Sequence, residues 1–191
     1  MRIIYLSFHH NISFYFILFF FFRVTLKASL FWVVLIYSEK IGGMEMELTV
    51  YLAGQIHDNW REEVAQKAKE NNLPLRFVGP QTNHDRSDNI GEEILGEQPT
   101  NFYKDDAASN INNFRTQVLM QKADIVIALF GEKYKQWNTA MDASTAIAMN
   151  KPTIIIRPES LIHPLKELSN KANVTVETVD QAIDVIRYIF D

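Results

Sequence analysis

Short apolar runs alternate with stretches of helical spacing along residues 46–191. The predicted strands are residues 48–54, 75–78, 124–130, 153–157 and 174–177. The predicted helices are residues 60–72, 111–122, 139–149 and 179–190. The longer strands are almost entirely apolar and β-branched, which is typical of strands that are buried on both faces of a sheet.

This alternation predicts an α/β protein with one doubly wound parallel sheet of five strands and helices on both faces. The expected strand order is the flavodoxin-like order 2-1-3-4-5. No internal repeat or linker interrupts residues 46–191, so we expect one domain there.

Residues 81–110 do not fit the alternation, because they carry many polar side chains and few periodic apolar positions. A connection of this length inside a compact domain is usually functional or disordered. It follows the second strand, so it lies at the carboxyl end of the sheet, where open α/β folds bind ligands.

Residues 1–45 have a different composition from the rest of the chain. Residues 1–43 hold 8 of the 13 Phe and carry a net charge of +3, whereas residues 44–191 carry −7. Neither of their two apolar runs is long enough to span a bilayer alone. Their codons would be AT-rich, and residues 41–46 can be encoded by a ribosome-binding sequence ahead of Met46. We interpret residues 1–45 as a mis-called extension of a bacterial gene; the alternative is a membrane segment or anchor.

The composition narrows the chemistry that is available. The chain has no Cys, which excludes disulfides, thiolate metal sites and cysteine nucleophiles, and favours a reducing compartment. The net charge of −4 offers no general attraction for nucleic acid. The spacing of the glycines matches neither the dinucleotide-binding fingerprint nor the Walker loop. We expect no metal and no cofactor.

Asp142 is the first candidate for chemistry. We place it in the first turn of the Ala-rich helix, with Asn138 or Thr139 as the N-cap. A carboxylate there would be ionised and held in one orientation by the helix dipole, as a nucleophile requires. The alternative is an ordinary stabilising acid in a first turn.

Other polar residues suggest a binding site for a small molecule. The loop that starts at Gly54 has the position and the free amide groups to bind a polar ligand. Trp137 is placed either to stack on a planar ring or to pack. The pairs His57 with Asp58 and His84 with Asp85 fit acid–base chemistry or scattered metal ligands; the alternative is that they are solvated loop residues.

Several motifs together resemble the nucleoside 2-deoxyribosyltransferase superfamily. These motifs are YLAG at residues 51–54, ADIVIA at 123–128, and TAMD at 139–142 followed by KP at 151–152. Two longer motifs look like the YtoQ family within it, namely GQIHDNWREE at 54–63 and GEKYKQWN at 131–138. The resemblance covers residues 46–191 and none of residues 1–45.

The resemblance implies an enzyme that acts on the N-glycosidic bond of a nucleoside or nucleotide. In the superfamily a carboxylate attacks the anomeric carbon of a 2-deoxynucleoside, the base leaves, and a second base or water takes the sugar. Asp142 occupies the nucleophile position, where the transferases carry Glu. Tyr51 matches the tyrosine whose hydroxyl contacts the nucleophile. Gly54, Gln55 and His57 match the loop beside the sugar.

Two acidic positions of the superfamily differ here. Gln136 stands where the transferases have an Asp, and Thr116 or Arg115 falls where another Asp is usual. The group that protonates the leaving base must then come from elsewhere. The candidates in the polar segment are Asp85, Asp88 and Asp105.

We therefore expect 2-deoxyribosyl transfer or hydrolysis, catalysed by Asp142 and Tyr51. The expected substrate-binding residues are Gly54, Gln55, His57, Asp85, Trp137 and Asn138. The alternatives are a non-catalytic domain that binds nucleosides or nucleotides, and a membrane-anchored protein if residues 1–45 are real. We expect a cytoplasmic protein with a small-molecule partner and, by resemblance, a homo-oligomer.

Overall fold

The computed structural model describes residues 46–133 and 135–191. Its strands are β1 (Leu48–Gly54), β2 (Leu75–Val78), β3 (Ile125–Leu129), β4 (Thr153–Ile156) and β5 (Val174–Val176). Its longer helices are α2 (Trp60–Glu70), α3 (His84–Leu95), α4 (Asn101–Lys122), α5 (Trp137–Ala148) and α7 (Val179–Arg187). Two short elements, η1 (Glu159–Leu161) and α6 (Lys166–Lys171), connect β4 to β5.

The five strands form one parallel sheet in the order β2-β1-β3-β4-β5. The predicted flavodoxin-like order is therefore confirmed. The register places Tyr51 of β1 between Val78 of β2 and Val126 of β3. Because side chains alternate along a strand, Tyr51 and Val126 point to one face of the sheet while Val50 and Ile125 point to the other.

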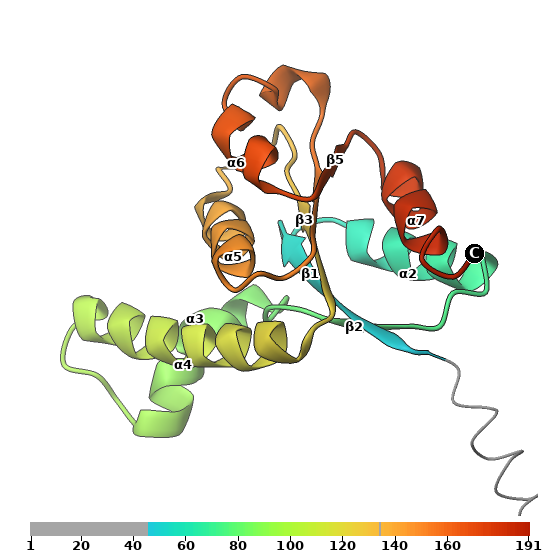
Figure 1. Cartoon of the computed structure of the whole chain (residues 1–191). Helices are drawn as coiled ribbons and strands as arrows, with labels where there is room; N and C mark the ends of the chain where they lie inside the picture. Colours follow the sequence, from blue (N-terminus) through green and yellow to red (C-terminus); the bar gives the residue numbers. More distant parts are fainter. Residues whose placement is uncertain (1–45, 134) are drawn as a thin grey trace, which may run out of the picture. The chain divides into compact units, whose positions relative to one another are not determined.

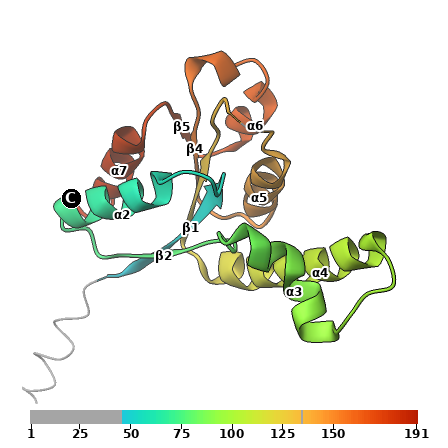
Figure 2. The same cartoon turned by 180° about the vertical axis from the view of Figure 1, so that it is seen from behind.

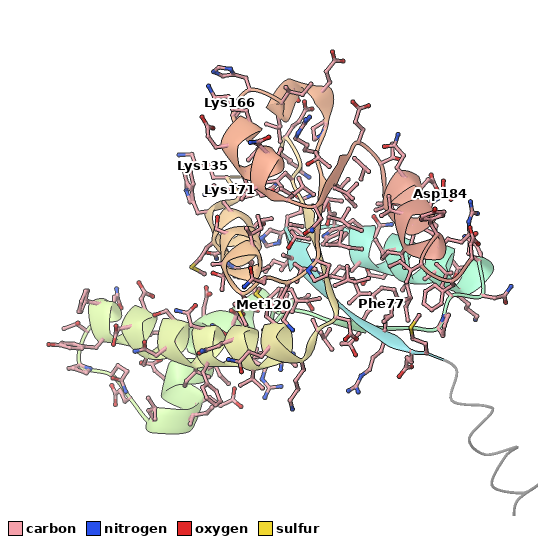
Figure 3. The ribbon with its side chains drawn as sticks, viewed as in Figure 1. Phe77, Met120, Lys135, Lys166, Lys171 and Asp184 are labelled. Atoms are coloured by element: carbon pink, nitrogen blue, oxygen red, sulfur yellow. The ribbon has the colours of Figure 1, made fainter. Side chains whose placement is uncertain are left out.

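Helices cover both faces of the sheet, as predicted (Figure 1). On one face, α2 and α7 pack on aliphatic side chains of β1, β3 and β4, and we call this the α7 face. On the other, α5 and the end of α4 pack on the sheet, and we call this the α5 face. Met120, labelled in Figure 3 where α4 meets the sheet, is fully buried on the α5 face.

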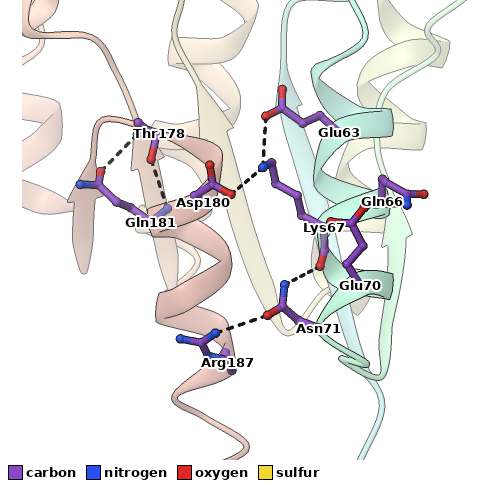
Figure 4. A network of polar contacts seen from close by, with 9 residues as sticks. All are labelled: Glu63, Gln66, Lys67, Glu70, Asn71, Thr178, Asp180, Gln181 and Arg187. Atoms are coloured by element: carbon purple, nitrogen blue, oxygen red, sulfur yellow. Dashed lines mark hydrogen bonds and ion pairs between the residues drawn. The ribbon is translucent and has the colours of Figure 1, made fainter.

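Polar contacts close the outer side of the α7 face (Figure 4). The Lys67 ammonium of α2 lies 2.6 Å from a carboxylate oxygen of Asp180 in α7 and 4.0 Å from Glu63. Arg187 of α7 donates a hydrogen bond of 3.3 Å to Asn71 at the end of α2. These contacts join the two helices whose apolar sides share one core.

Residues 81–110 form helices, whereas the sequence predicted a long connection without regular structure. They contain the whole of α3 and the first ten residues of α4, so the helix expected from Ile111 begins at Asn101. The two helices lie side by side in both views (Figure 1, Figure 2). A Cβ atom added at Gly91 would lie 2.7 Å from the Ala107 Cβ, so α3 approaches α4 at small residues. Large apolar positions are not needed at such a contact, and the sequence pattern therefore did not reveal it.

The interpretation of residues 1–45 as a mis-called extension lies outside the described residues, and so does the alternative of a membrane segment. Within residues 46–133 and 135–191, no helix combines the length and apolar character needed to cross a bilayer.

Candidate active site

A pocket of about 590 Å³ opens at the carboxyl ends of β1, β2 and β3. Its walls come from the loop after β1, the loop after β2, α3, α4, and the start of α5 with the residues before it. Six of the residues predicted to form the site line it: Gly54, Gln55, His57, Trp137, Asn138 and Asp142. The structure thus brings together side chains that are up to 88 positions apart in the sequence.

Asp142 lies deep in this pocket with 7% of its surface exposed. Helix α5 begins at Trp137 after the N-cap Gln136, so Asp142 is its sixth residue and lies in the second turn. The prediction of a first-turn position capped by Asn138 or Thr139 is wrong, because both residues are already helical. The carboxylate is therefore held by its burial and its neighbours rather than by the free amides of the helix start.

The hydroxyl of Tyr51 contacts Asp142 from behind the pocket wall. Tyr51 is fully buried on the α5 face, and its Oη donates a hydrogen bond of 3.3 Å to Asp142 Oδ2. The same oxygen lies 3.4 Å from Thr116 Oγ1 of α4. Tyr51 itself does not line the pocket, so its hydroxyl acts on the pocket through Asp142.

Burial controls the ionisation of both groups. It raises the pKa of Asp142 to about 6, against the smaller lowering effects of the Tyr51 hydrogen bond and the Arg61 charge. This direction is opposite to the helix-dipole effect expected from the sequence. At pH 7 the ionised form still exceeds the protonated form by roughly ten to one. Burial, followed by the charge of Asp142, raises the pKa of Tyr51, so its hydroxyl remains a donor.

Arg61 of α2 supports the loop beside the pocket. Its guanidinium donates to the backbone carbonyls of Gly54 at 2.8 Å and Leu52 at 3.3 Å, and also to that of Gln55. It lies 4.7 Å from the centre of the Trp60 ring. No individual role was expected for Arg61 from the sequence, although it lies within the motif GQIHDNWREE at residues 54–63 and in the first turn of the helix after β1.

Gln55 presents an unpaired acceptor beside the pocket. Its Nε2 donates to Asp58 Oδ2, and its Oε1 is buried without a hydrogen-bond partner among the described residues. A buried acceptor in this state is normally satisfied by water or a ligand. Gln55 is therefore suited to accept a hydrogen from a hydroxyl or amino group of a bound molecule.

The rim of the pocket carries aromatic and imidazole rings. Trp137 is 75% exposed, and Asn138 follows it on the same rim. The rings of His57 and His84 meet edge to face with their centres 5.7 Å apart. His84 lies 3.6 Å from Asp88, which also lines the pocket. The predicted pairing of His84 with Asp85 is replaced by this i,i+4 contact.

Asp85 is the one predicted binding residue that the structure does not bring to the pocket or its floor. It belongs to α3, where positions 84, 87 and 88 line the pocket and position 85 points elsewhere. The sequence did not predict α3, so this side chain had no assigned direction. Of the three candidate proton donors, Asp88 and Asp105 line the pocket.

Gln136 also lines the pocket, but its amide is engaged. Its Oε1 accepts from the Gly131 N–H at 3.2 Å, and its Nε2 donates to the Gly131 carbonyl at 3.0 Å. The side chain thus closes the loop that leads into α5. Within the described ranges, no group of three or more His, Asp or Glu is placed to hold a metal ion.

Comparisons with known proteins agree on one family. The model of the family described as nucleoside 2-deoxyribosyltransferase YtoQ matches residues 51–190. A Bacillus subtilis (strain 168) protein named YtoQ is 73% identical over 146 residues, which are 76% of this chain and 99% of that protein.

Two solved structures of lower identity also match the chain. A conserved protein from Enterococcus faecalis V583 is 12% identical, with a TM-score of 0.51 over 75% of this chain and 99% of that one. A 2-deoxyribosyltransferase from Bacillus psychrosaccharolyticus is 18% identical, with a TM-score of 0.47 over 71% of this chain and 90% of that one. The likeness to the Enterococcus protein concerns the fold alone.

Proposed function

The chain belongs to the family described as nucleoside 2-deoxyribosyltransferase YtoQ, and from this membership we propose that it transfers 2-deoxyribosyl groups between bases or to water. One observation carries the proposal: a buried carboxylate, that of Asp142, faces a pocket large enough for a nucleoside. A titratable group with a raised pKa in a cleft is a typical candidate for catalysis.

In the proposed reaction Asp142 is the nucleophile. Because Oδ2 accepts the Tyr51 hydrogen bond, we assign the attack to Oδ1. A bond forms between Oδ1 and the anomeric carbon while the N-glycosidic bond breaks, and its electron pair goes to the leaving base together with a proton. A second base or water then attacks the same carbon, passes its proton to the acid that protonated the first base, and frees the carboxylate. The two inversions give net retention.

The ionisation of Asp142 sets the pH range of the proposed reaction, and the length of its side chain sets where the sugar must lie. Only the ionised carboxylate attacks, so activity should fall below a pH of about 6. Asp is one methylene shorter than Glu, which retracts the carboxylate by roughly 1.5 Å, one carbon–carbon bond. The sugar must therefore lie deeper, against Asp142, so that the reacting atoms come within ~3 to 3.5 Å.

The rim suits a planar base. We propose that the exposed indole of Trp137 stacks on the base and that the Asn138 amide bonds to its edge. Gln55 Oε1 would accept a hydrogen from the sugar, beside Gly54 and His57. The proton for the leaving base would come from Asp88 or Asp105, which line the pocket, whereas Asp85 does not.

The test uses the full chain with a panel of 2-deoxynucleosides and free acceptor bases, followed by separation of the products. We expect base exchange or release, and we expect Asp142→Asn to lower kcat by roughly a thousandfold or more. The matched control is Asp184→Asn, an exposed acid on α7 at the other face of the sheet (Figure 3). Turnover that survives Asp142→Ala would refute the assigned role.

The second candidate is a domain that binds nucleosides or nucleotides without turnover. The hydrogen bonds of Gln136 favour this second candidate. Both the oxygen and the nitrogen of its side-chain amide are bonded to Gly131, and a glutamine at this position supplies no acid. Binding by calorimetry with no product over the whole panel would establish this reading.

The setting of the reaction is part of the proposal. The absence of Cys fits a reducing compartment, and we propose the cytoplasm. We also propose a homo-oligomer, because several large apolar side chains of α3 and α4 are exposed. They are Ile94, Leu95, Phe102, Tyr103 and Phe114. Light scattering of the purified full chain tests the oligomer.

A further inference from the structure

Three side chains from three elements form a row behind the pocket. Thr116 of α4, Tyr51 of β1 and Asp142 of α5 lie in that order, with Tyr51 Oη 3.4 Å from Thr116 Oγ1 and 3.3 Å from Asp142 Oδ2. Tyr51 is fully buried, Asp142 nearly so, and Thr116 is half-buried with its side chain in the pocket wall. No role follows for Thr116 from the sequence or from the proposed reaction.

Counting hydrogens fixes the direction of the row. A phenol carries one hydrogen and accepts through its lone pairs, and an ionised carboxylate only accepts. When Asp142 is ionised, the Tyr51 hydrogen must therefore go to Asp142. The contact between Tyr51 and Thr116 then has to use the hydrogen of Thr116, so the order of donation is Thr116 to Tyr51 to Asp142.

The direction reverses when Asp142 is protonated. The carboxyl hydrogen can then go to the Tyr51 oxygen, and the Tyr51 hydrogen to the Thr116 oxygen. A threonine hydroxyl both donates and accepts, so it satisfies Tyr51 in either state. Without Thr116, the buried Tyr51 hydroxyl would have a single hydrogen-bond partner, Asp142. The protonation state of Asp142 would then depend on which of its two forms bonds better to Tyr51 alone.

We propose that Thr116 is a positioning residue that donates its hydroxyl hydrogen to Tyr51 and thereby directs the Tyr51 hydrogen at the ionised Asp142 carboxylate. Donation to a phenol oxygen polarises its O–H bond and strengthens the next hydrogen bond in the row. Thr116 therefore favours the attacking form of Asp142. The consequence for rate rests on the proposed function, whereas the consequence for ionisation does not.

Other charged or titratable groups face Asp142 or its pocket without contacting Thr116 in the hydrogen-bond row. The Arg61 charge comes from α2, and the pocket walls bring His57 from the loop after β1, His84 and Asp88 from α3, Asp105 from α4 and Lys135 from the residues before α5. Thr116 carries no charge, so its effect on Asp142 passes through Tyr51. This dependence on one neighbour is what the experiment tests.

The experiment measures the ionisation of Asp142 in the full chain by a ¹³C NMR titration of its carboxyl carbon, assigned with Asp142→Asn. We expect Thr116→Val to raise the midpoint by about half a pH unit, as the loss of one neutral hydrogen bond implies, and Thr116→Ser to restore it. In Tyr51→Phe, adding Thr116→Val should change nothing further. The matched control, Thr145→Val, changes an exposed Thr on α5 outside the pocket.

Steady-state kinetics provide a second test of the role of Thr116. With 2-deoxynucleoside substrates, Thr116→Val should lower kcat about threefold at pH 5, where the half-unit shift reduces the ionised fraction of Asp142 by that factor, and by less than about 1.5-fold at pH 7, with KM within about twofold at both. If Thr116→Val does not fold, Thr116→Ala takes its place. If Thr116→Val shifts the midpoint but the protein turns over no substrate, the hydrogen-bond row is supported and the proposed function is refuted. An unchanged midpoint, or an equal shift in Thr145→Val or on top of Tyr51→Phe, would overturn the role of Thr116.

Discussion

The two faces of the sheet are built from the same strands but bury different chemistry. On the α7 face, Val50, Leu52, Ile125 and Ile127 belong to one core with the apolar sides of α2 and α7. On the α5 face, the alternate positions of the same strands include small side chains such as Ala53 and Ala128, together with the phenol of Tyr51. One face is a closed apolar core, and the other combines close packing with buried polar groups.

The difference shows how one sheet provides both stability and a site. Ala143 and Ala146 let α5 lie close to the strands, so that Asp142 of the same helix comes within hydrogen-bond distance of Tyr51. Burying a carboxylate lowers the free energy of unfolding, whereas burying aliphatic groups raises it. We therefore expect substitutions on the α7 face to lower stability and substitutions on the α5 face to change activity.

Ile186→Ala on the α7 face should have the largest effect on stability. Ile186 is fully buried, and its truncation leaves a cavity that lowers the free energy of unfolding by about 2 to 5 kcal/mol. Urea unfolding measures it, with Ile189→Ala, half-exposed beyond the end of α7, as the control. The activity of the folded fraction should stay unchanged. A loss of kcat in fully folded Ile186→Ala would break the division between the faces.

Asp142→Asn on the α5 face should have the opposite sign and should stabilise the protein. Burial raises the folded pKa of Asp142 from 3.8 to about 6, so its destabilising effect is nearly absent below the unfolded pKa, grows between the two pKa values and is complete above the folded one. The substitution should add about 3 kcal/mol at pH 7 and less than about 1 kcal/mol at pH 4. Urea unfolding at both values checks this. Equal changes at the two pH values would show that burial does not control this carboxylate.

How much the sequence could predict differs between the two faces. The strands were predicted correctly because continuous β-branched runs mark strands that are buried on both sides. Their order is not visible in the sequence, and the flavodoxin-like order expected for this alternation was confirmed by the structure. Helix α3 was missed because its contact with α4 uses Gly91 and Ala107 instead of large apolar positions. Asp85 was consequently placed at the site without a helix to give it a direction.

Within the site, the local pattern pointed to Asp142 but not to its surroundings. Its turn and the direction of its pKa were wrong, because the start of α5 is set by Gln136 and the loop it closes, and because burial outweighs the helix dipole. Thr116 meets Tyr51 across 65 positions of sequence, and only the packing of α4 beside β1 brings them together. Chemistry that depends on such contacts has no local signature.

Gly91→Ala tests the pocket wall that α3 and α4 form. The added Cβ would lie 2.7 Å from the Ala107 Cβ and from the Ala108 nitrogen, so the helices must move apart. We expect a loss of about 1 to 3 kcal/mol and a raised KM, because the α3 wall carries His84 and Asp88. The control is Asn89→Ala, a change at an exposed position of the same helix that does not line the pocket. An unchanged KM would mean that this wall does not touch the substrate.

The ion pair between Lys67 and Asp180 should matter least. Both side chains reach the surface, where water and salt screen the pair, so Lys67→Met should leave stability and activity almost unchanged. Thermal unfolding at low and high salt measures this. A large, salt-dependent loss would show that the polar contacts at the edge of the α7 face, rather than its core, hold α2 and α7 together.

The proposed reaction requires a covalent bond between Asp142 and the sugar, and trapping this adduct tests the proposal most directly. The full chain is mixed with a 2-deoxynucleoside in the absence of an acceptor base, quenched in acid within one turnover, digested and analysed by mass spectrometry. The account predicts an added 2-deoxyribosyl group on the peptide that contains Asp142, and its absence from Asp142→Asn. Turnover with no adduct, or an adduct on another carboxylate, would contradict the account.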